Sequence, residues 1–308
     1  MFDSEQKPCG NGNRQEGNRD VGAYIVTQVT LLLVVAGLRI SFAIETMEEL
    51  PGIRRKKRLR ELFKMAASMG YDGIELHISD PRKTDVSFLK ELAVSHGLEV
   101  PAIGTGPTYT LHGISFLSSP GARKRAVDRL REYIRVARVL RAVVIVGLIR
   151  GRLAGGRFTR YKAWKTIQDC LVRGAALAEE QGVILAIEPI NRYETDLINT
   201  LAEALSMAAD VDSESVKIMA DTFHMNIEEA SIAHSLRQSR GKLAHFHVAD
   251  SNRLSPGKGH LDFASIISEL KGIGYEGYLS AEILPKPSVE QASLDTIQYL
   301  KPLLTSGN

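Results

Sequence analysis

From Leu38 onward, short apolar runs alternate with longer amphipathic stretches along the chain. The short runs have the length and β-branched content of buried strands, and the stretches between them repeat apolar residues at the helical spacing. Eight such units follow one another without an intervening linker. The expected strands cover residues 38–44, 73–78, 99–105, 142–148, 183–188, 216–221, 243–250 and 277–282.

Helical patterns occupy the stretches between these strands, for example 58–70, 123–140, 165–182 and 263–274. Gly70, Gly182 and Gly274 stand where a glycine commonly ends a helix. Eight strand–helix units in about 270 residues fit a closed barrel better than an open doubly wound sheet. The sequence therefore predicts the α/β class and a single (β/α)8 TIM barrel over residues 37–308.

Residues 1–36 do not belong to this pattern. Their first part is polar and mixes acidic with basic side chains, so it lacks the positive start of an export signal. The apolar stretch 23–38 is shorter than the roughly 20 residues of a membrane span and contains Thr27, Gln28 and Thr30. We expect an N-terminal extension that is disordered or loosely attached, and no membrane partner.

Composition and charge limit the partners, the cellular compartment and the cofactors that we expect. Of 308 residues, 44% are hydrophobic, and 39 Lys and Arg nearly balance 36 Asp and Glu. The near balance predicts no nucleic-acid partner, and the basic run 54–58 is interpreted as the solvated start of a helix. Two cysteines favour a reducing compartment, so we expect a cytoplasmic protein. The phosphate-binding glycine patterns are absent, which predicts no nucleotide cofactor.

Polar residues recur at the ends of four consecutive expected strands. They are Glu188, Asp221, His247 and Glu282. In a barrel the carboxyl ends of the strands share one rim, so these side chains can converge. Three carboxylates buried together repel one another unless a cation neutralises them. The set predicts one divalent ion, with Mn²⁺, Mg²⁺ or Co²⁺ favoured by the oxygen ligands and Zn²⁺ also allowed.

Each of these side chains could instead cap its own strand or pair with a neighbouring Lys or Arg. For any one of these side chains taken alone, the sequence supports the two interpretations about equally. Their recurrence at equivalent positions of four strands favours the shared ion.

Six segments carry a resemblance to a known family. In chain order they are GYDGIELHISDP (70–81), AIGTGPTY (102–109), VIVGLIRGR (144–152), IEPINRYETDLINT (187–200), IMADTFHMNIEE (218–229) and HFHVADSNRLSPGKGHLDF (245–263). Together they resemble the xylose-isomerase-like TIM-barrel superfamily and, within it, ketose 3-epimerases of the tagatose and psicose 3-epimerase type. The 5-keto-L-gluconate epimerases of inositol catabolism show the nearest likeness.

The resemblance implies an isomerase that inverts the carbon next to the carbonyl of a ketose or keto-uronate, such as 5-keto-L-gluconate or tagaturonate. It makes Glu188, Asp221, His247 and Glu282 ligands of one ion, Mn²⁺ foremost. Glu188 and Glu282 would be the catalytic pair, which moves a proton through a metal-stabilised enediolate. His224, Arg253 and Glu194 would contact the sugar. Relatives of this kind also imply a homo-oligomer, a dimer or a tetramer.

Further candidates for substrate binding follow from position alone. Strand alternation places Glu75 and His77 on one side of the second strand, so both are expected to line the site. Arg150 and Arg152 lie in a glycine-rich loop over 147–160, directly after the fourth strand. A lid that carries these guanidinium groups would favour an acidic sugar.

Three alternative functions stay open at this stage. A lyase of the inosose dehydratase type could use the same ion and carboxylates. An abasic-site endonuclease shares the fold, but its relatives carry more histidines, and Thr105 and Gly106 stand at the end of the third strand here. A non-catalytic sugar-binding protein would not need Glu188 and Glu282 together.

Overall fold

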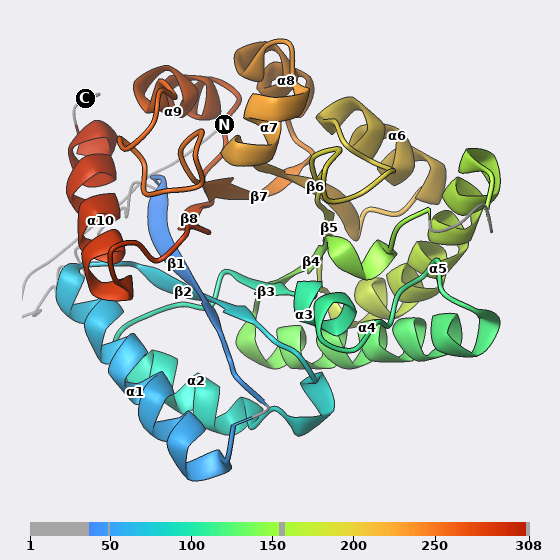
Figure 1. The fold of residues 1–308 in the computed structure, drawn as a ribbon, viewed down its shortest axis with the longest axis horizontal. Helices are drawn as coiled ribbons and strands as arrows, with labels where there is room; N and C mark the ends of the chain where they lie inside the picture. Colours follow the sequence, from blue (N-terminus) through green and yellow to red (C-terminus); the bar gives the residue numbers. More distant parts are fainter. Residues whose placement is uncertain (1–36, 49, 154–157, 306–308) are drawn as a thin grey trace, which may run out of the picture. The chain divides into compact units, whose positions relative to one another are not determined.

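The strands form one closed parallel barrel in which each strand pairs with the next in chain order and β8 pairs with β1 (Figure 1). The computed structural model describes residues 37–48, 50–153 and 158–305. The strands are β1 (Arg39–Glu45), β2 (Gly73–His77), β3 (Ala102–Gly104), β4 (Val143–Val146), β5 (Leu185–Ile187), β6 (Val216–Asp221), β7 (Leu243–Val248) and β8 (Tyr278–Ala281).

A ring of helices surrounds the barrel (Figure 1). The outer helices are α1 (Gly52–Met69), α2 (Val86–Ser95), α4 (Pro120–Leu140), α5 (Arg160–Gln181), α6 (Leu201–Val211), α8 (Ile232–Gln238), α9 (Phe263–Gly272) and α10 (Val289–Thr305). Shorter helical turns begin within a few residues of the ends of four strands: η1 (Pro81–Lys83), α3 (Gly106–Thr110), η2 (Leu148–Arg150) and α7 (Thr222–Glu228). These turns lie at the carboxyl ends of the strands, where barrel enzymes carry their chemistry.

Local sequence signals set the helix ends. Thr159 and Thr200 accept hydrogen bonds from the first turns of α5 and α6, and Asp262 does the same for α9. Gly70 and Gly182 end α1 and α5 in the left-handed conformation, as the sequence predicts.

The barrel encloses an apolar cluster of small and medium side chains from the four neighbouring strands β3 to β6, formed by Ala102, Ile145, Ala186 and Met219. A second and larger core packs the outer face of the strands against the helices. On the side of β3 to β6, the interior of the barrel is therefore filled by apolar side chains.

The predicted fold class is confirmed: the described residues form a (β/α)8 barrel. The third strand is shorter than expected, because Pro101 has no N–H to donate and separates β3 from an isolated pairing of Glu99 with Gly73. The predicted extension, residues 1–36, lies outside the described residues, as do residues 154–157 of the predicted lid.

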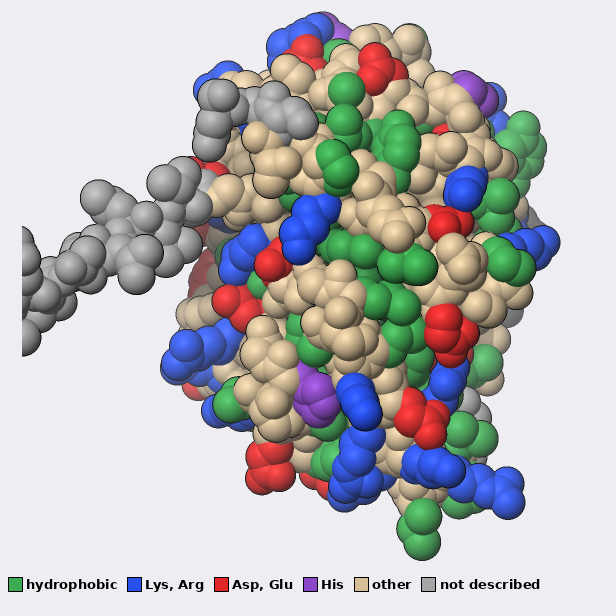
Figure 2. All heavy atoms as spheres, turned by 90° about the vertical axis from the view of Figure 1, so that its left-hand side faces the viewer, with side chains coloured by type: hydrophobic (Ala, Val, Ile, Leu, Met, Phe, Trp, Pro, Cys, Tyr) green, Lys and Arg blue, Asp and Glu red, His purple; other side chains and the backbone are tan. Residues whose placement is uncertain are grey.

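The basic run 54–58 lies in α1, where Arg54 and Lys57 are exposed. Lys and Arg side chains gather toward the lower end of the face shown in Figure 2. Among the helices of the described residues, none combines the length and the apolar character of a membrane span.

Candidate active site

The four predicted ligands meet at the carboxyl ends of β5 to β8. Glu188 and Glu282 directly follow β5 and β8, Asp221 is the last residue of β6, and His247 lies in β7. One nitrogen or oxygen from each of the four lies within 4.8 Å of those of the other three. Nδ1 of His247 is 3.6 Å from Oδ2 of Asp221, 3.6 Å from Oε2 of Glu282 and 3.9 Å from Oε1 of Glu188.

Two atoms of this cluster are buried without a hydrogen-bond partner: Oδ2 of Asp221 and Nδ1 of His247. Buried polar atoms are rarely left unpaired, since each costs about 1–3 kcal/mol. Both atoms face the other two carboxylates, and a divalent ion at the centre would satisfy them together. One imidazole and three carboxylates are a donor set that such ions accept.

The two glutamates of the cluster differ in their electrostatic surroundings. Burial, followed by the charge of Glu282, raises the pKa of Glu188 to about 7. Burial also pushes the pKa of Glu282 upward, but its interactions with His247, His77 and Arg253 outweigh burial and hold that pKa below its usual range. Because the two groups interact, they titrate as a pair rather than independently. Their pKa values are displaced in opposite directions.

Gly147 makes the room that Glu188 occupies. It lies between β4 and η2, beside the end of β5. A Cβ at this position would stand 2.1 Å from Oε2 of Glu188, well inside van der Waals contact. Only a residue without a side chain therefore fits next to this carboxylate.

On the open side of the cluster, Arg253 joins two carboxylates. Its Nη2 donates to Oε2 of Glu282 at 2.9 Å, and its Nη1 donates to Oε1 of Glu194 at 3.1 Å. The guanidinium also lies over the ring of Phe223, 4.9 Å from the centroid. Arg253 thus links the ligand cluster to a residue of the loop that follows β5.

The loop after β7 holds Arg253 in place. The buried carboxylate of Asp250 accepts from the backbone N–H groups of Ser251, Gly257 and Leu261. Arg253 itself has a positive φ of 61°, and its N–H donates to the carbonyl of Asp250. Asp250 therefore orders the turn that presents the arginine.

His224, from α7, lies beside the same cluster. Its Nε2 is 3.9 Å from Oδ2 of Asp221, and its Nδ1 pairs with Nδ2 of Asn191 at 2.8 Å. The same amide nitrogen of Asn191 donates to Oε1 of Glu194 at 2.9 Å. Asn191 was not among the residues predicted from sequence, although it lies inside the E-x₅-E segment that begins at Glu188.

A cavity of about 60 Å³ opens above the cluster. It is lined by His77, Gly104, Thr105, Gly106, Ile145, Leu148, Glu188, Ile190, Glu194, His224, His247, Arg253 and Glu282. A larger cavity, about 580 Å³, lies at the amino ends of the strands, beside Arg39, Val143 and Tyr278. We favour the smaller cavity as the site, because barrel chemistry lies at the carboxyl ends and the unpartnered ligand atoms are there.

The two candidates for substrate binding from β2, His77 and Glu75, lie at different depths in the barrel. His77 lines the cavity, whereas Glu75 has no exposed surface and its oxygens are bonded within the protein. The expected contact of Glu75 with substrate therefore does not fit the structure, because the carboxylate lies too deep in the barrel.

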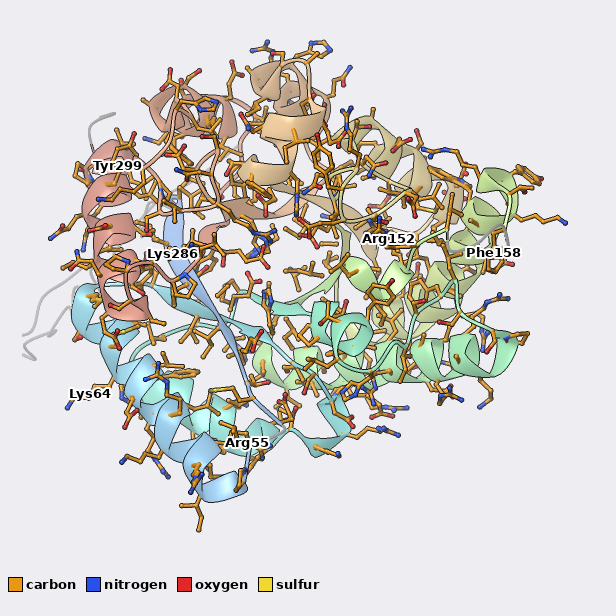
Figure 3. The ribbon with its side chains drawn as sticks, viewed as in Figure 1. Arg55, Lys64, Arg152, Phe158, Lys286 and Tyr299 are labelled. Carbon is orange, nitrogen blue, oxygen red and sulfur yellow. The ribbon has the colours of Figure 1, made fainter. Side chains whose placement is uncertain are left out.

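The two lid arginines do not line the cavity either. Arg150 is buried, and its Nη1 donates to the carbonyls of Val146 and Glu188. Arg152 lies on the side of the barrel where α5 and α6 lie, and it pairs with Asp196 at 3.7 Å (Figure 3). Arg150 thus joins the loop to the backbone of the β4 and β5 ends, and Arg152 joins it to Asp196 in the loop after β5.

A comparison with known protein families identifies the family of this chain. The family described as "Xylose isomerase-like TIM barrel" matches residues 63–303. The chain belongs to this family. That membership confirms the superfamily resemblance read from the sequence motifs.

Among characterised members of the family, several sugar epimerases are similar to this chain. An L-ribulose 3-epimerase of Mesorhizobium japonicum is 33% identical over 229 residues, which cover 72% of this chain and 74% of that protein. A 3-dehydro-D-guloside 4-epimerase of Escherichia coli is 29% identical over 257 residues, 80% of this chain and 95% of that protein. The nearer likeness to 5-keto-L-gluconate epimerases is not shown by these relatives and stays a prediction.

Solved structures agree with the sequence relatives. A structure of L-ribulose 3-epimerase superimposes with a TM-score of 0.76 at 26% identity and covers 87% of this chain and 95% of that one. A D-allulose 3-epimerase from Methylomonas sp. in complex with D-allulose gives a TM-score of 0.73 at 25% identity, over 86% of this chain and 97% of that one.

Proposed function

We propose that the protein is a metal-dependent sugar epimerase that inverts the carbon next to the carbonyl of a ketose. One observation carries the proposal: Glu188 and Glu282, from strands on different sides of one ligand cluster, face a shared cavity together with Arg253. The family relatives named as ketose 3-epimerases support the same reaction class.

The chemistry requires the removal of a proton from carbon and its return on the opposite face. When bound, a divalent ion supplies Lewis-acid stabilisation for the negative charge that develops on the sugar oxygens. One of the two glutamates accepts the proton from the carbon, and the other donates a proton to the opposite face. The roles exchange when the reaction runs in reverse.

Arg253 and its partners would hold the sugar. A ketohexose is larger than the 60 Å³ of the cavity, so the lining must open to admit it, and we propose that Arg253 gives up at least one of its two ion pairs. The released guanidinium and the His224 ring then have donors free for sugar oxygens. Fixing several oxygens at once orients the reacting carbon between the glutamates.

A neutral ketose is the better-supported substrate. The acidic candidates, 5-keto-L-gluconate and tagaturonate, depend on Arg150 and Arg152, and neither lines the cavity. The carboxylates of the site would also repel an acidic sugar. For the ion, we propose Mn²⁺, because the donor set is dominated by hard oxygen ligands.

Proton exchange with solvent tests the proposed function. The purified protein with added Mn²⁺ is incubated in D₂O with a panel of neutral ketoses and keto-uronates, and the products are analysed by NMR and mass spectrometry. We expect deuterium at one carbon beside the carbonyl, with a second epimer of the same composition. Loss of water from the sugar would show a lyase instead, and no incorporation with any sugar would refute the proposal.

Arg253→Lys separates charge from geometry at the cavity. Lysine keeps the positive charge, but it cannot join Glu282 and Glu194 through two nitrogens of one planar group. We expect kcat/KM for the best ketose to fall by about tenfold or more, a cost of roughly 1.4 kcal/mol. Arg82→Lys is the control, because the Arg82 side chain is exposed, pairs with Asp80 and lies outside the cavity. Equal kinetics for the two variants would contradict a substrate role for Arg253.

A further inference from the structure

A second group of polar side chains lies in the barrel beneath the ligand cluster, and its centre is Glu75. The carboxylate of Glu75, on β2, is fully buried. Four side chains from β2, β7 and β8 bond to it: His245 at 2.7 Å, Ser280 at 2.7 Å, His77 at 2.8 Å, and His247 at 2.9 and 3.1 Å. None of these contacts is used by the proposed reaction itself.

The bond to His247 has a chemical consequence. Nε2 of this ring faces Glu75, whereas Nδ1 faces the three carboxylates of the ligand cluster. A carboxylate is a strong acceptor with no proton to give, so it draws the ring proton to Nε2. The lone pair is then left on Nδ1, the atom that an ion must bind.

We propose that Glu75 is a positioning residue that keeps the His247 ring oriented and protonated at Nε2, so that Nδ1 is available to a metal ion. The same carboxylate holds His77, whose Nδ1 lies 3.8 Å from Oε1 of Glu282. Glu75 therefore braces the ligand cluster from below through two histidines. This role replaces the substrate contact expected from the sequence.

A second ion at Glu75 is the competing interpretation. Atoms of Glu75, His245 and His247 lie close enough to share one. However, the separations of 2.7 to 3.1 Å between their nitrogens and oxygens are those of hydrogen bonds, so protons join these groups directly.

The inference rests on the metal dependence in the proposed function, and Glu75→Gln tests it by metal binding. The amide has one oxygen and a pair of donor hydrogens, so it cannot accept from all of these rings, and a donor toward Nε2 would shift the His247 proton to Nδ1. We expect the Mn²⁺ affinity, measured by calorimetry, to fall by about 10- to 100-fold. Glu99→Gln, an exposed glutamate at the other end of the barrel, is the control and should bind as the wild type does.

Glu75→Asp is the second variant, since it keeps the charge but shortens the reach, and it should recover part of the affinity. If Glu75→Gln does not fold, the wild type alone still decides. In the zinc-loaded protein, the ¹⁵N shifts of the His247 ring should show the metal at Nδ1 and the proton at Nε2. Metal at Nε2, or a folded Glu75→Gln protein with wild-type affinity, would overturn the inference. A protein that binds Mn²⁺ as expected but turns over no sugar would refute only the proposed function.

Discussion

Glu282→Gln is expected to abolish epimerisation while the barrel stays folded. The amide cannot accept a proton from carbon, and it removes one of the carboxylates that surround Nδ1 of His247. General acid–base catalysis contributes about 10² to 10⁴ in rate, so the loss of deuterium exchange at the carbon beside the ketone should reach about 10³-fold. Circular dichroism and thermal unfolding would establish that the variant keeps its fold.

The matched control for this variant is Glu276→Gln, at an exposed position shortly before β8. It should exchange deuterium at the wild-type rate. If Glu282→Gln also exchanges at that rate, Glu282 is not part of the catalytic pair.

Gly147→Ala should weaken metal binding and lower activity together through a single methyl group. The new Cβ would stand 2.1 Å from Oε2 of Glu188 and 3.4 Å from the Cδ1 of Ile190, so the carboxylate must rotate away from the cluster. A ligand set short of one carboxylate should bind Mn²⁺ at least about tenfold more weakly, and kcat/KM should fall with it. Calorimetry and initial rates measure the two effects.

Gly272→Ala provides the comparison, because nothing lies within 4 Å of a Cβ at that position. It replaces glycine at the end of α9, where alanine favours the helix. Its metal affinity and activity should equal those of the wild type. Unchanged Mn²⁺ affinity in Gly147→Ala would show that Glu188 is not a ligand.

The fold could be predicted because its signals are local. Apolar runs of strand length, helical periodicity between them and glycine helix ends such as Gly70 and Gly182 all point to repeated βα units. The four candidate ligands could be found for a related reason: each lies within one residue of the end of a strand, and the barrel brings equivalent strand ends together.

The depth at which a side chain lies within the barrel could not be predicted in this way. Strand alternation correctly puts Glu75 and His77 on one side of β2, but it does not tell which of them reaches the cavity. That depends on the stagger between neighbouring strands, which is a property of the closed barrel. Glu75 lies one layer too deep for a sugar, and His77 lines the cavity.

Contacts between loops that are distant in the chain could not be predicted from the sequence either. The fit of Gly147 against Glu188 and the bond of Arg150 to the carbonyl of Glu188 join segments about 40 residues apart. Arginines in a glycine-rich loop have the same composition whether they turn outward to a ligand or inward to the backbone. Only the packed structure distinguishes the two.

All four candidate ligands come from the second half of the chain, β5 to β8, whereas Glu75 comes from β2 in the first half. If Glu75 positions His247, a folding intermediate in which the halves have not yet joined would hold the ligands without their brace. Tight capture of manganese would then begin only when β1 pairs with β8. The rate at which the refolding chain takes up the ion would then report the closure of the barrel between β8 and β1.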